Sequence, residues 1–144
     1  MNKDDLRAQR IARKMMNNEG TAPNWKLEYE DGGVGWARVS MVVKRDMLNG
    51  HQNAHGGMIF SLADTAFAYA CNSHNEISVA QQASISYLSP GKLNERLTAH
   101  AKEIVREGRS GSCAVIIKGE DGRVVATFQG LSRTIRGKVI NEED

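Results

Sequence analysis

Asp64 is the only charged residue in the mostly apolar segment from Gly56 to Ser73, which has the pattern of a helix. An ionised carboxylate loses solvation in apolar surroundings, so a chain that keeps one there usually uses it in a binding or catalytic site. The preceding run from Asn49 to Gly57, NGHQNAHGG, places polar side chains and a glycine pair at the start of this helix. Because a helix N-terminus offers unpaired N–H groups to negative charge, these residues together predict an active site.

The bulk composition limits the classes of protein to which the chain can belong. Its 144 residues are enough for one domain with a hydrophobic core and too few for two ordinary domains. With 40% hydrophobic and 25% charged residues it has a typical globular composition, and its net charge of +2 is far below the basic excess of a dedicated nucleic-acid binder. We therefore expect a single domain over residues 1–144 and no nucleic-acid partner.

The N-terminus and the cysteines predict where the protein works. The first 20 residues carry acidic side chains and lack the apolar segment of a signal peptide, and no run of about 18 apolar residues is free of charge. Cys71 and Cys113 show no C-x-x-C spacing, so reduced thiols are the simplest interpretation. We expect a cytoplasmic protein without membrane contact.

Hydrophobic periodicity predicts the elements that must position the candidate residues. It favours a short N-terminal helix over 4–16, within the segment 1–20, and a long buried helix from 58 to about 73. Alternating patterns and turn signals predict strands over 25–30, 35–43, 79–88, 93–106, 112–118 and 124–135, with a hairpin turn at 31–33. Short turns imply antiparallel neighbours, so the order predicts an α+β fold in which one curved antiparallel sheet wraps around a helix. The charged C-terminal segment 139–144 is expected to be disordered.

The segment from Leu48 to Ser73, LNGHQNAHGGMIFSLADTAFAYACNS, resembles the signature of hotdog-fold acyl-CoA thioesterases, in detail those of the bacterial phenylacetate-degradation (PaaI) type. The similarity extends through residues 86–91, SYLSPG, and more loosely to about Gly137. An H-G-G motif with an acidic residue eight positions after its first glycine is far more specific than H-G-G alone. The resemblance implies a hotdog fold, hydrolysis of aryl- or phenylacetyl-type acyl-CoA, an assembly of two or four copies, and no cofactor beyond the coenzyme A of the substrate.

The family pattern also implies roles for individual residues of this sequence. It places the catalytic carboxylate on Asp64, the backbone N–H that polarises the thioester carbonyl on Gly56, and helper roles on Asn49 and His55. Substrate contacts are expected at Gly57, Thr65 and Ser84 and, for the phosphates of coenzyme A, at basic residues in turns and near strand ends, namely Lys92, Arg109, Arg133, Arg136 and Lys138. Each of these basic residues also fits a solvated surface charge.

Two positions depart from the pattern of close relatives. Ser89 stands before the proline where those relatives often have arginine, so Lys92 is expected to take over a phosphate contact. Met58 replaces a polar residue of some relatives directly after the glycine pair, which would alter the acyl pocket. Phe67, Tyr69 and Tyr87 fit the lining of an aromatic acyl group as well as an ordinary core.

The chemistry of thioester hydrolysis needs these residue types. The carbonyl oxygen gains negative charge as it is attacked, and a backbone N–H at a helix N-terminus meets that charge without reorganising, which is worth about 3 kcal/mol per donor in other enzymes. Asp64 would either deprotonate a water molecule or attack the carbonyl itself to form a mixed anhydride. The sequence leaves both routes open. We favour the general-base route, with the Asn49 amide holding the water through its acceptor and its donors.

A distance argument predicts that two copies of the chain share the site. Eight residues at about 1.5 Å each separate Asp64 from Gly56 by about 12 Å along the helix. The attacking oxygen and the oxyanion donor should both lie about 3 Å from the reacting group. One copy therefore supplies Gly56 and its two-fold partner supplies Asp64, so the site requires a dimer.

Each candidate also has a purely structural interpretation. Asp64 would fit a buried carboxylate hydrogen-bonded to Ser61, Thr65 or the backbone, and the glycine pair a plain transition from loop to helix. His55 fits a helix-capping residue as well as a catalytic one, and Asn49 fits a turn residue. The motif as a whole favours the catalytic interpretation of the carboxylate and of the glycine pair.

A metal site and a nucleophilic cysteine are disfavoured. His51 and His55 are four residues apart, with Asp64 as a conceivable third ligand, but the glycines around the histidines disfavour a helix there, so the spacing carries no ligand geometry. Cys71 and Cys113 lack the basic sequence neighbours that activate a thiol and fit core positions.

Two other functions are compatible with the same fold. Dehydratases and hydratases of acyl thioesters combine a catalytic histidine with an acidic residue and a proline-bearing loop, whereas the prolines here, Pro23 and Pro90, are not near His55 in the sequence. A non-catalytic acyl-CoA binding module would gain nothing from the desolvated Asp64. Hydrolysis of an acyl-CoA thioester is therefore the leading hypothesis.

Overall fold

The computed structural model describes residues 1–142. Two helices, α1 (Lys3–Asn17) and α2 (Thr21–Trp25), precede a hairpin of β1 (Glu28–Gly33) and β2 (Trp36–Val42). The long helix α3 (Gly56–Cys71) comes next, between the 3-10 turns η1 (Arg45–Met47) and η2 (Asn72–His74). Four strands complete the fold: β3 (Ser78–Tyr87), β4 (Arg96–Glu107), β5 (Ser110–Lys118) and β6 (Val124–Thr134).

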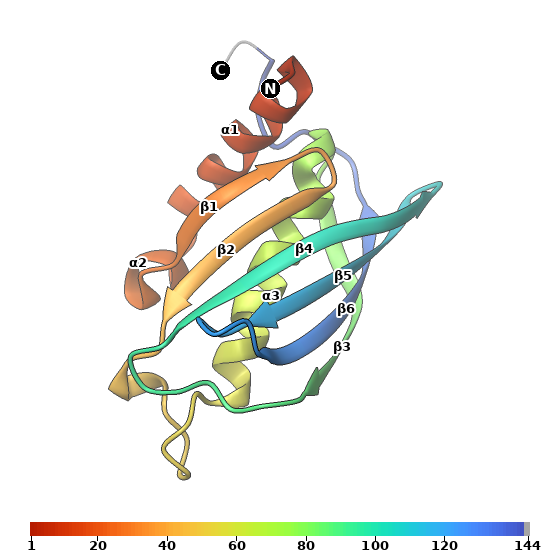
Figure 1. Cartoon of the computed structure of the whole chain (residues 1–144). Helices are drawn as coiled ribbons and strands as arrows, with labels where there is room; N and C mark the ends of the chain where they lie inside the picture. Colours follow the sequence, from red (N-terminus) through yellow and green to blue (C-terminus); the bar gives the residue numbers. More distant parts are fainter. Residues whose placement is uncertain (143–144) are drawn as a thin grey trace.

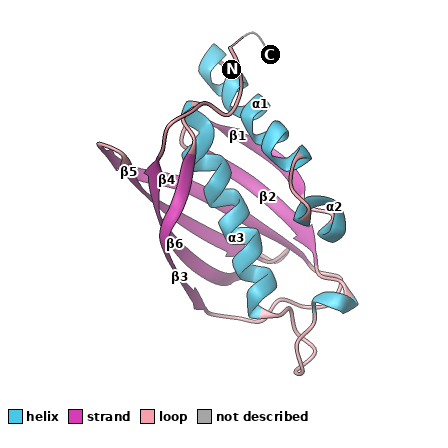
Figure 2. Cartoon of the chain, turned by 180° about the vertical axis from the view of Figure 1, so that it is seen from behind, coloured by secondary structure: helices cyan, strands magenta, loops and turns pink. Residues whose placement is uncertain are grey.

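The six strands form one antiparallel sheet in the order β1-β2-β4-β5-β6-β3. In Figures 1 and 2 the sheet curves around α3, which lies across one of its faces, while α1 lies beside β1. The predicted α+β architecture, a curved antiparallel sheet around a long helix, is therefore confirmed. Among the described helices, none is long and apolar enough to cross a membrane.

Small and aromatic residues let α3 pack closely on the sheet. Leu62, Ala63 and Ala66 on its inner side are fully buried. The ring of Phe67 lies against Gly130 of β6, where a Cβ would come within 2.7 Å of the ring. A side chain at position 130 would therefore push the helix away from the sheet, which explains the glycine there.

The opposite side of α3 is only partly covered by the described residues. Ser61, Asp64, Thr65 and Ala68 lie on this side and are only half-buried. Strand β3 lies at one edge of the sheet, so one row of its backbone groups has no strand beside it. The helix that the sequence marks as buried on nearly every side thus keeps one half-open face, and Asp64 lies on it.

Three local predictions were wrong. The hairpin turn predicted at 31–33 lies inside β1, and the chain turns at Val34 and Gly35, where the positive φ of 79° suits glycine. The strand predicted over 25–30 begins at Glu28, because residues 21–25 form α2, which is too short to show helical periodicity. Of the tail predicted to be disordered, residues 143–144 lie outside the described part, but the N–H groups of Val139 and Ile140 donate to the Asn75 side chain at 3.1 and 3.0 Å.

Candidate active site

The loop before α3 is a compact turn closed by its own hydrogen bonds. The Asn49 N–H donates to the Asn53 carbonyl at 2.8 Å, and the Asn49 side-chain oxygen accepts the N–H groups of His51 and Asn53 at 2.9 and 3.2 Å. The predicted use of this oxygen to hold a water is therefore wrong, because the loop already occupies it. Only the Asn49 side-chain NH₂ group is left for a water or a substrate.

His55 caps the N-terminus of α3. Its backbone is extended, and its Nδ1 accepts the N–H of Gly57 at 2.9 Å. Because an accepting Nδ1 carries no proton, the proton of the neutral ring is on Nε2. The capping interpretation of His55 is therefore confirmed, and Nε2 is the nitrogen left for any contact with a substrate.

Gly56 carries the unpaired N–H of the first helical turn. The N–H groups of Met58 and Ile59 donate to the His55 carbonyl at 2.9 and 3.2 Å, and that of Gly57 donates to the His55 ring. Within residues 1–142, no group accepts the N–H of Gly56. An unpaired N–H at this end of a helix carries the positive end of the helix dipole and therefore suits a site of developing negative charge.

A hollow of about 450 Å³ opens beside this N–H. It is lined by Asn49, His51, Asn53, Ala54, Gly56, Ile59, Tyr87, Leu88, Ser89 and Pro90. It thus joins the loop before α3 to the segment SYLSPG, the two stretches that carry the sequence signature. We call this hollow the mouth of α3. Two of the predicted catalytic residues, Asn49 and Gly56, meet in it.

Asp64 lies two turns further along the half-open side of α3. Burial raises the pKa of its carboxyl above the ordinary value of 3.8. In the described part of the chain it accepts no hydrogen bond and forms no ion pair. The predicted alternative of a structural carboxylate bonded to neighbouring hydroxyls is wrong, because Ser61 donates to the Gly57 carbonyl at 2.9 Å and Thr65 to the Ser61 carbonyl at 2.8 Å. A partly desolvated carboxylate without a partner is a suitable general base.

Glu19 is a second half-buried carboxylate beside α3, and sequence reasoning missed it. Its Oε1 accepts the hydroxyl of Tyr69 at 2.9 Å, and its Oε2 lies 3.4 Å from the hydroxyl of Thr21. Burial raises the pKa of Glu19, and the charge of Asp64 adds to that rise. The charge of Asp64 therefore acts on the ionisation of Glu19, whereas burial alone accounts for the raised pKa of Asp64. No sequence signal pointed to Glu19, because 50 residues separate it from Tyr69.

Comparison with known proteins decides the family. The sequence profile of the thioesterase superfamily matches residues 51–126, which include Gly56 and Asp64. The acyl-coenzyme A thioesterase PaaI of Escherichia coli strain K12 is 39% identical over 136 residues, which are 94% of this chain and 97% of that protein. The chain belongs to the thioesterase superfamily.

Solved structures support the same assignment. The PaaI protein from the E. coli phenylacetic acid degradation operon matches with a TM-score of 0.91 at 39% identity, over 93% of this chain and 97% of that one. A mutant of the phenylacetic acid degradation protein PaaI from Thermus thermophilus matches with a TM-score of 0.78 at 31% identity, over 81% and 100%. A hypothetical thioesterase with coenzyme A from Streptococcus pneumoniae matches with a TM-score of 0.75 at 28% identity, over 78% of this chain and 88% of that one. The predicted hotdog fold is confirmed, and the chain is a thioester hydrolase.

Other residues predicted to contact the substrate of this thioesterase do not gather at the mouth of α3 within one chain. Ser84 lies opposite Gln129 on the face of the sheet away from α3, because its neighbours Ala83 and Ile85 pack on the core. Arg109 and Arg136 line a separate hollow with Glu76, near the C-terminal end of α3. Arg133, on β6, pairs in register with Val79 and Ser110. Lys92 is exposed in the loop after the SYLSPG segment.

Arg123 is the basic residue that contacts Ser89 in this thioesterase, and the sequence analysis did not predict it. Its guanidinium donates to the Ser89 hydroxyl and to the Pro90 carbonyl, each at 3.0 Å. It also donates to the carboxylates of Glu95 and Asp121 at 2.8 and 2.9 Å. Arg123 thus fixes the wall of the mouth at Ser89 and Pro90. Because two carboxylates balance its charge, little of that charge is left for a phosphate.

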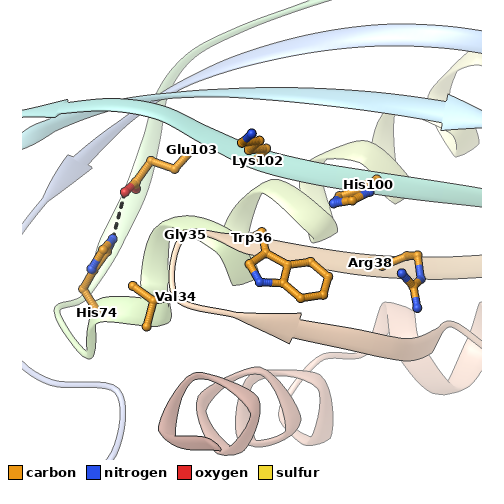
Figure 3. Close-up of a pocket in the computed structure, with 8 residues that line it drawn as sticks. All are labelled: Val34, Gly35, Trp36, Arg38, His74, His100, Lys102 and Glu103. Carbon is orange, nitrogen blue, oxygen red and sulfur yellow. Dashed lines mark hydrogen bonds and ion pairs between the residues drawn. The ribbon is translucent and has the colours of Figure 1, made fainter. Parts of the chain in front are cut away.

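Another hollow, of about 530 Å³, lies on the face of the sheet away from α3. Figure 3 shows its lining around Trp36, Arg38, His100 and Lys102, with the hydrogen bond between His74 and Glu103 at one end. None of the predicted site residues lines this hollow. We therefore take the mouth of α3, with its unpaired donor, as the candidate active site.

The two thiols of the described chain are buried. Burial raises the pKa of Cys71 and of Cys113 to about 12, so both remain protonated at neutral pH and are poor nucleophiles. No cluster of three His, Cys, Asp or Glu side chains able to hold a metal occurs in residues 1–142.

Proposed function

We propose that this thioesterase hydrolyses acyl-CoA, with aryl- or phenylacetyl-type acyl groups preferred. The observation that carries the proposal is the pairing pattern of α3: the Gly56 N–H has no acceptor, and on the same helix the half-buried Asp64 has no donor, within the described chain. No other described residue occupies either group, so each is available to a ligand. A thioester carbonyl for the first and a water for the second would supply the missing partners.

The proposed reaction proceeds by general-base attack of water. The Gly56 N–H donates to the carbonyl oxygen of the thioester, while Asp64 takes a proton from a water that forms the new C–O bond. Collapse of the tetrahedral intermediate breaks the C–S bond, and the proton passes to the departing thiolate of coenzyme A. The products are a free acid and a thiol. This chemistry needs no metal or cofactor besides the coenzyme A of the substrate.

Isotope labelling tests the route that Asp64 takes. In single-turnover hydrolysis in heavy-oxygen water, a general base leaves the Asp64 carboxylate unlabelled, whereas a mixed anhydride that water opens at the Asp64 carbonyl carbon leaves label in that carboxylate. Mass spectrometry of the peptide that contains Asp64 distinguishes the two. Label in this peptide would contradict the general-base route and support the anhydride route.

The site is proposed to form between two copies of the chain. Gly56 and Asp64 are about 12 Å apart along α3, too far for one carbonyl to meet both within a single copy. The half-open side of α3 and the free edge of β3 are surfaces on which a second copy would fit. Pairing of two such dimers would give the tetramer expected from the resemblance.

Subunit mixing tests this sharing. Asp64→Asn and Gly56→Ala homodimers are each expected to be nearly inactive. If the residues act across the interface, a mixed dimer holds one intact site and one doubly defective site, so random exchange restores about a quarter of the wild-type rate. If they act within one chain, no intact site arises and no activity returns, which would exclude the shared site.

The substrate is tested by thiol release over a panel of acyl-CoA compounds. The proposal expects the highest kcat/KM with phenylacetyl-CoA or another aryl-CoA, because the PaaI relatives named above belong to phenylacetic acid degradation. Straight-chain acyl groups of similar size serve as the comparison. Equal or better turnover of the straight-chain substrates would remove the aromatic preference and leave the thioesterase assignment in place.

The phosphates of coenzyme A are proposed to contact exposed basic residues near the mouth. Lys92 is the nearest candidate, since the carbonyl of Gly91 accepts the N–H of Ala54 in the mouth lining. Arg109, Arg133 and Arg136 would have to reach the substrate from another copy. Replacing any one of these four basic residues by a neutral residue is expected to raise KM and to leave kcat nearly unchanged.

A further inference from the structure

A tyrosine outside the predicted catalytic set contacts the first turn of α3. Tyr87 is the last residue of β3, and its hydroxyl donates to the Gly56 carbonyl at 2.8 Å. Its ring lies over the α-carbon of Gly56, where a Cβ would come within 3.0 Å of the hydroxyl and 3.1 Å of the ring carbon that bears it. A residue 31 positions away in the sequence thus touches the glycine whose N–H is the proposed oxyanion donor.

The peptide group between Gly56 and Gly57 is held at both of its polar ends. Tyr87 donates to its carbonyl, and the His55 ring accepts its N–H at 2.9 Å. Burial raises the pKa of the Tyr87 phenol above the ordinary value of 10, so at neutral pH it is protonated and able to donate. With this peptide fixed on both sides, the backbone of Gly56 has little freedom to turn its own N–H away from the mouth.

We propose that Tyr87 is a positioning residue, which keeps the Gly56 N–H aimed at the carbonyl oxygen of the bound thioester. The inference rests on the proposed function, because it needs that N–H to be the oxyanion donor. Such a donor must lie about 2.7–3.1 Å from the oxyanion, so a small shift of the helix start weakens it. Core packing is a poor explanation for the contact, because 51% of Tyr87 remains exposed.

Removal of the hydroxyl alone tests the proposal. Tyr87→Phe keeps the ring and is expected to lower kcat about tenfold with KM within about twofold, a fraction of the effect of losing a whole oxyanion donor. Its thermal unfolding should stay close to wild type, because one hydrogen bond to an accessible carbonyl adds little net stability. Tyr29→Phe is the matched control: it removes the hydroxyl of a tyrosine on β1, at the opposite edge of the sheet from β3, and is expected to leave kcat and KM unchanged.

A double-mutant cycle separates action through Gly56 from other effects. In the Gly56→Ala background the contact is already disturbed, since the added Cβ would lie 3.0 Å from the Tyr87 hydroxyl, which has to move away. Tyr87→Phe should therefore cost far less than tenfold there. A full tenfold loss in both backgrounds would overturn the proposal, because Tyr87 would then act independently of Gly56.

Two other results would also overturn it. A raised KM with unchanged kcat would make Tyr87 a contact of the acyl group, and unchanged values of both would make it dispensable. The amide resonance of Gly56 in nitrogen-15 spectra gives a readout that needs no turnover. It should shift in Tyr87→Phe and stay in place in Tyr29→Phe. If the Gly56 resonance shifts in Tyr87→Phe but the wild type cleaves no thioester, the proposed function is wrong and the contact between Tyr87 and Gly56 is real. If the wild type is active and the resonance does not shift, the proposed function stands and the positioning role of Tyr87 is wrong.

Discussion

The two ends of α3 differ in how completely their polar groups are paired. At the N-terminal end the Gly56 N–H has no acceptor, and two turns on Asp64 has no donor within the described chain. At the C-terminal end the buried side chain of Asn72 donates to the carbonyls of Ala68 and Ser78 and accepts the N–H of Ser78, all at 2.9–3.0 Å. In the described residues the N-terminal half of α3 thus keeps a donor and a carboxylate with which a substrate would pair, whereas the Asn72 side chain at the C-terminal end is paired within the fold.

The paired end also anchors the helix to the sheet. The Ser73 hydroxyl donates to the Ala70 carbonyl at 2.6 Å and accepts the N–H of Gly35 from the turn between β1 and β2 at 2.8 Å. His74 contacts the carboxylate of Glu103 on β4 at 2.9 Å. A helix held firmly at its C-terminal end can present an open N-terminus in a fixed place, which is the preorganisation that oxyanion stabilisation needs.

The largest expected effect comes from Asp64 on the open side. Asp64→Asn preserves the shape and removes the base, so kcat should fall by about 10²- to 10⁴-fold while substrate affinity stays within a few-fold. Thiol release under saturating substrate measures the loss. Glu19→Gln is the matched control, because it neutralises the other half-buried carboxylate and keeps an acceptor for Tyr69.

The Glu19→Gln control shows whether the loss of kcat depends on the position of the carboxylate or only on the total negative charge beside α3. Glu19→Gln should retain most of the wild-type kcat at neutral pH. An undiminished rate in Asp64→Asn would refute the catalytic role of Asp64. Equal losses in both variants would instead assign the effect to the total charge beside α3.

An asparagine at each end allows the same substitution to be compared directly. Asn72→Ala leaves the N–H and the carbonyl of Ser78 unpaired in the core and should lower the free energy of unfolding by about 2–4 kcal/mol, with normal kcat in the folded protein. Asn49→Ala should instead lower kcat and change the free energy of unfolding little. The N–H groups of the loop that it frees are near water, while the substrate loses an amide donor. Denaturant unfolding and thiol release together measure both.

The comparison fails if the two variants behave alike. Loss of kcat in folded Asn72→Ala would show that the C-terminal end tunes the chemistry. A large loss of stability in Asn49→Ala would show that the open end is also a structural anchor.

Patterns of short range were enough to predict most of the fold. Periodicity gave α3 and the four strands after it to within a few residues, because each of these elements has one clear face. The helix formed by residues 21–25 was not predicted, since five residues are too few to show a helical period. Likewise the turn of the first hairpin was displaced, because glycines at 32 and 33 fit a strand with a bulge as well as a turn.

The candidate site was predictable only where the motif is contiguous. Asn49, Gly56 and Asp64 follow from one string, whereas Tyr87, Arg123 and Glu19 reach the site from distant parts of the chain. Their roles depend on which strands become neighbours and on the direction of each side chain. Hydrogen bonds across 31 to 50 residues leave no periodic trace in a single sequence.

His55 tests the open end more mildly. His55→Ala removes the acceptor of the Gly57 N–H and should cost about 1 kcal/mol of stability together with a several-fold loss of kcat. His55→Asn supplies another good N-cap and should recover both. If this variant is as stable as wild type but as slow as His55→Ala, then Nε2 of His55 contacts the substrate and capping alone does not explain its place in the motif.

The smallest expected effect concerns the pH profile. Turnover needs the Asp64 carboxylate, so activity is present above its pKa and is lost as the pH falls through a pKa that burial has raised above 3.8. The charge of Asp64 raises the pKa of Glu19, whereas burial alone accounts for the raised pKa of Asp64. Glu19→Gln should therefore leave both the acid limb and the plateau of the kcat profile in place. A limb that moves to lower pH in Glu19→Gln would show that the Glu19 carboxylate also raises the pKa of Asp64.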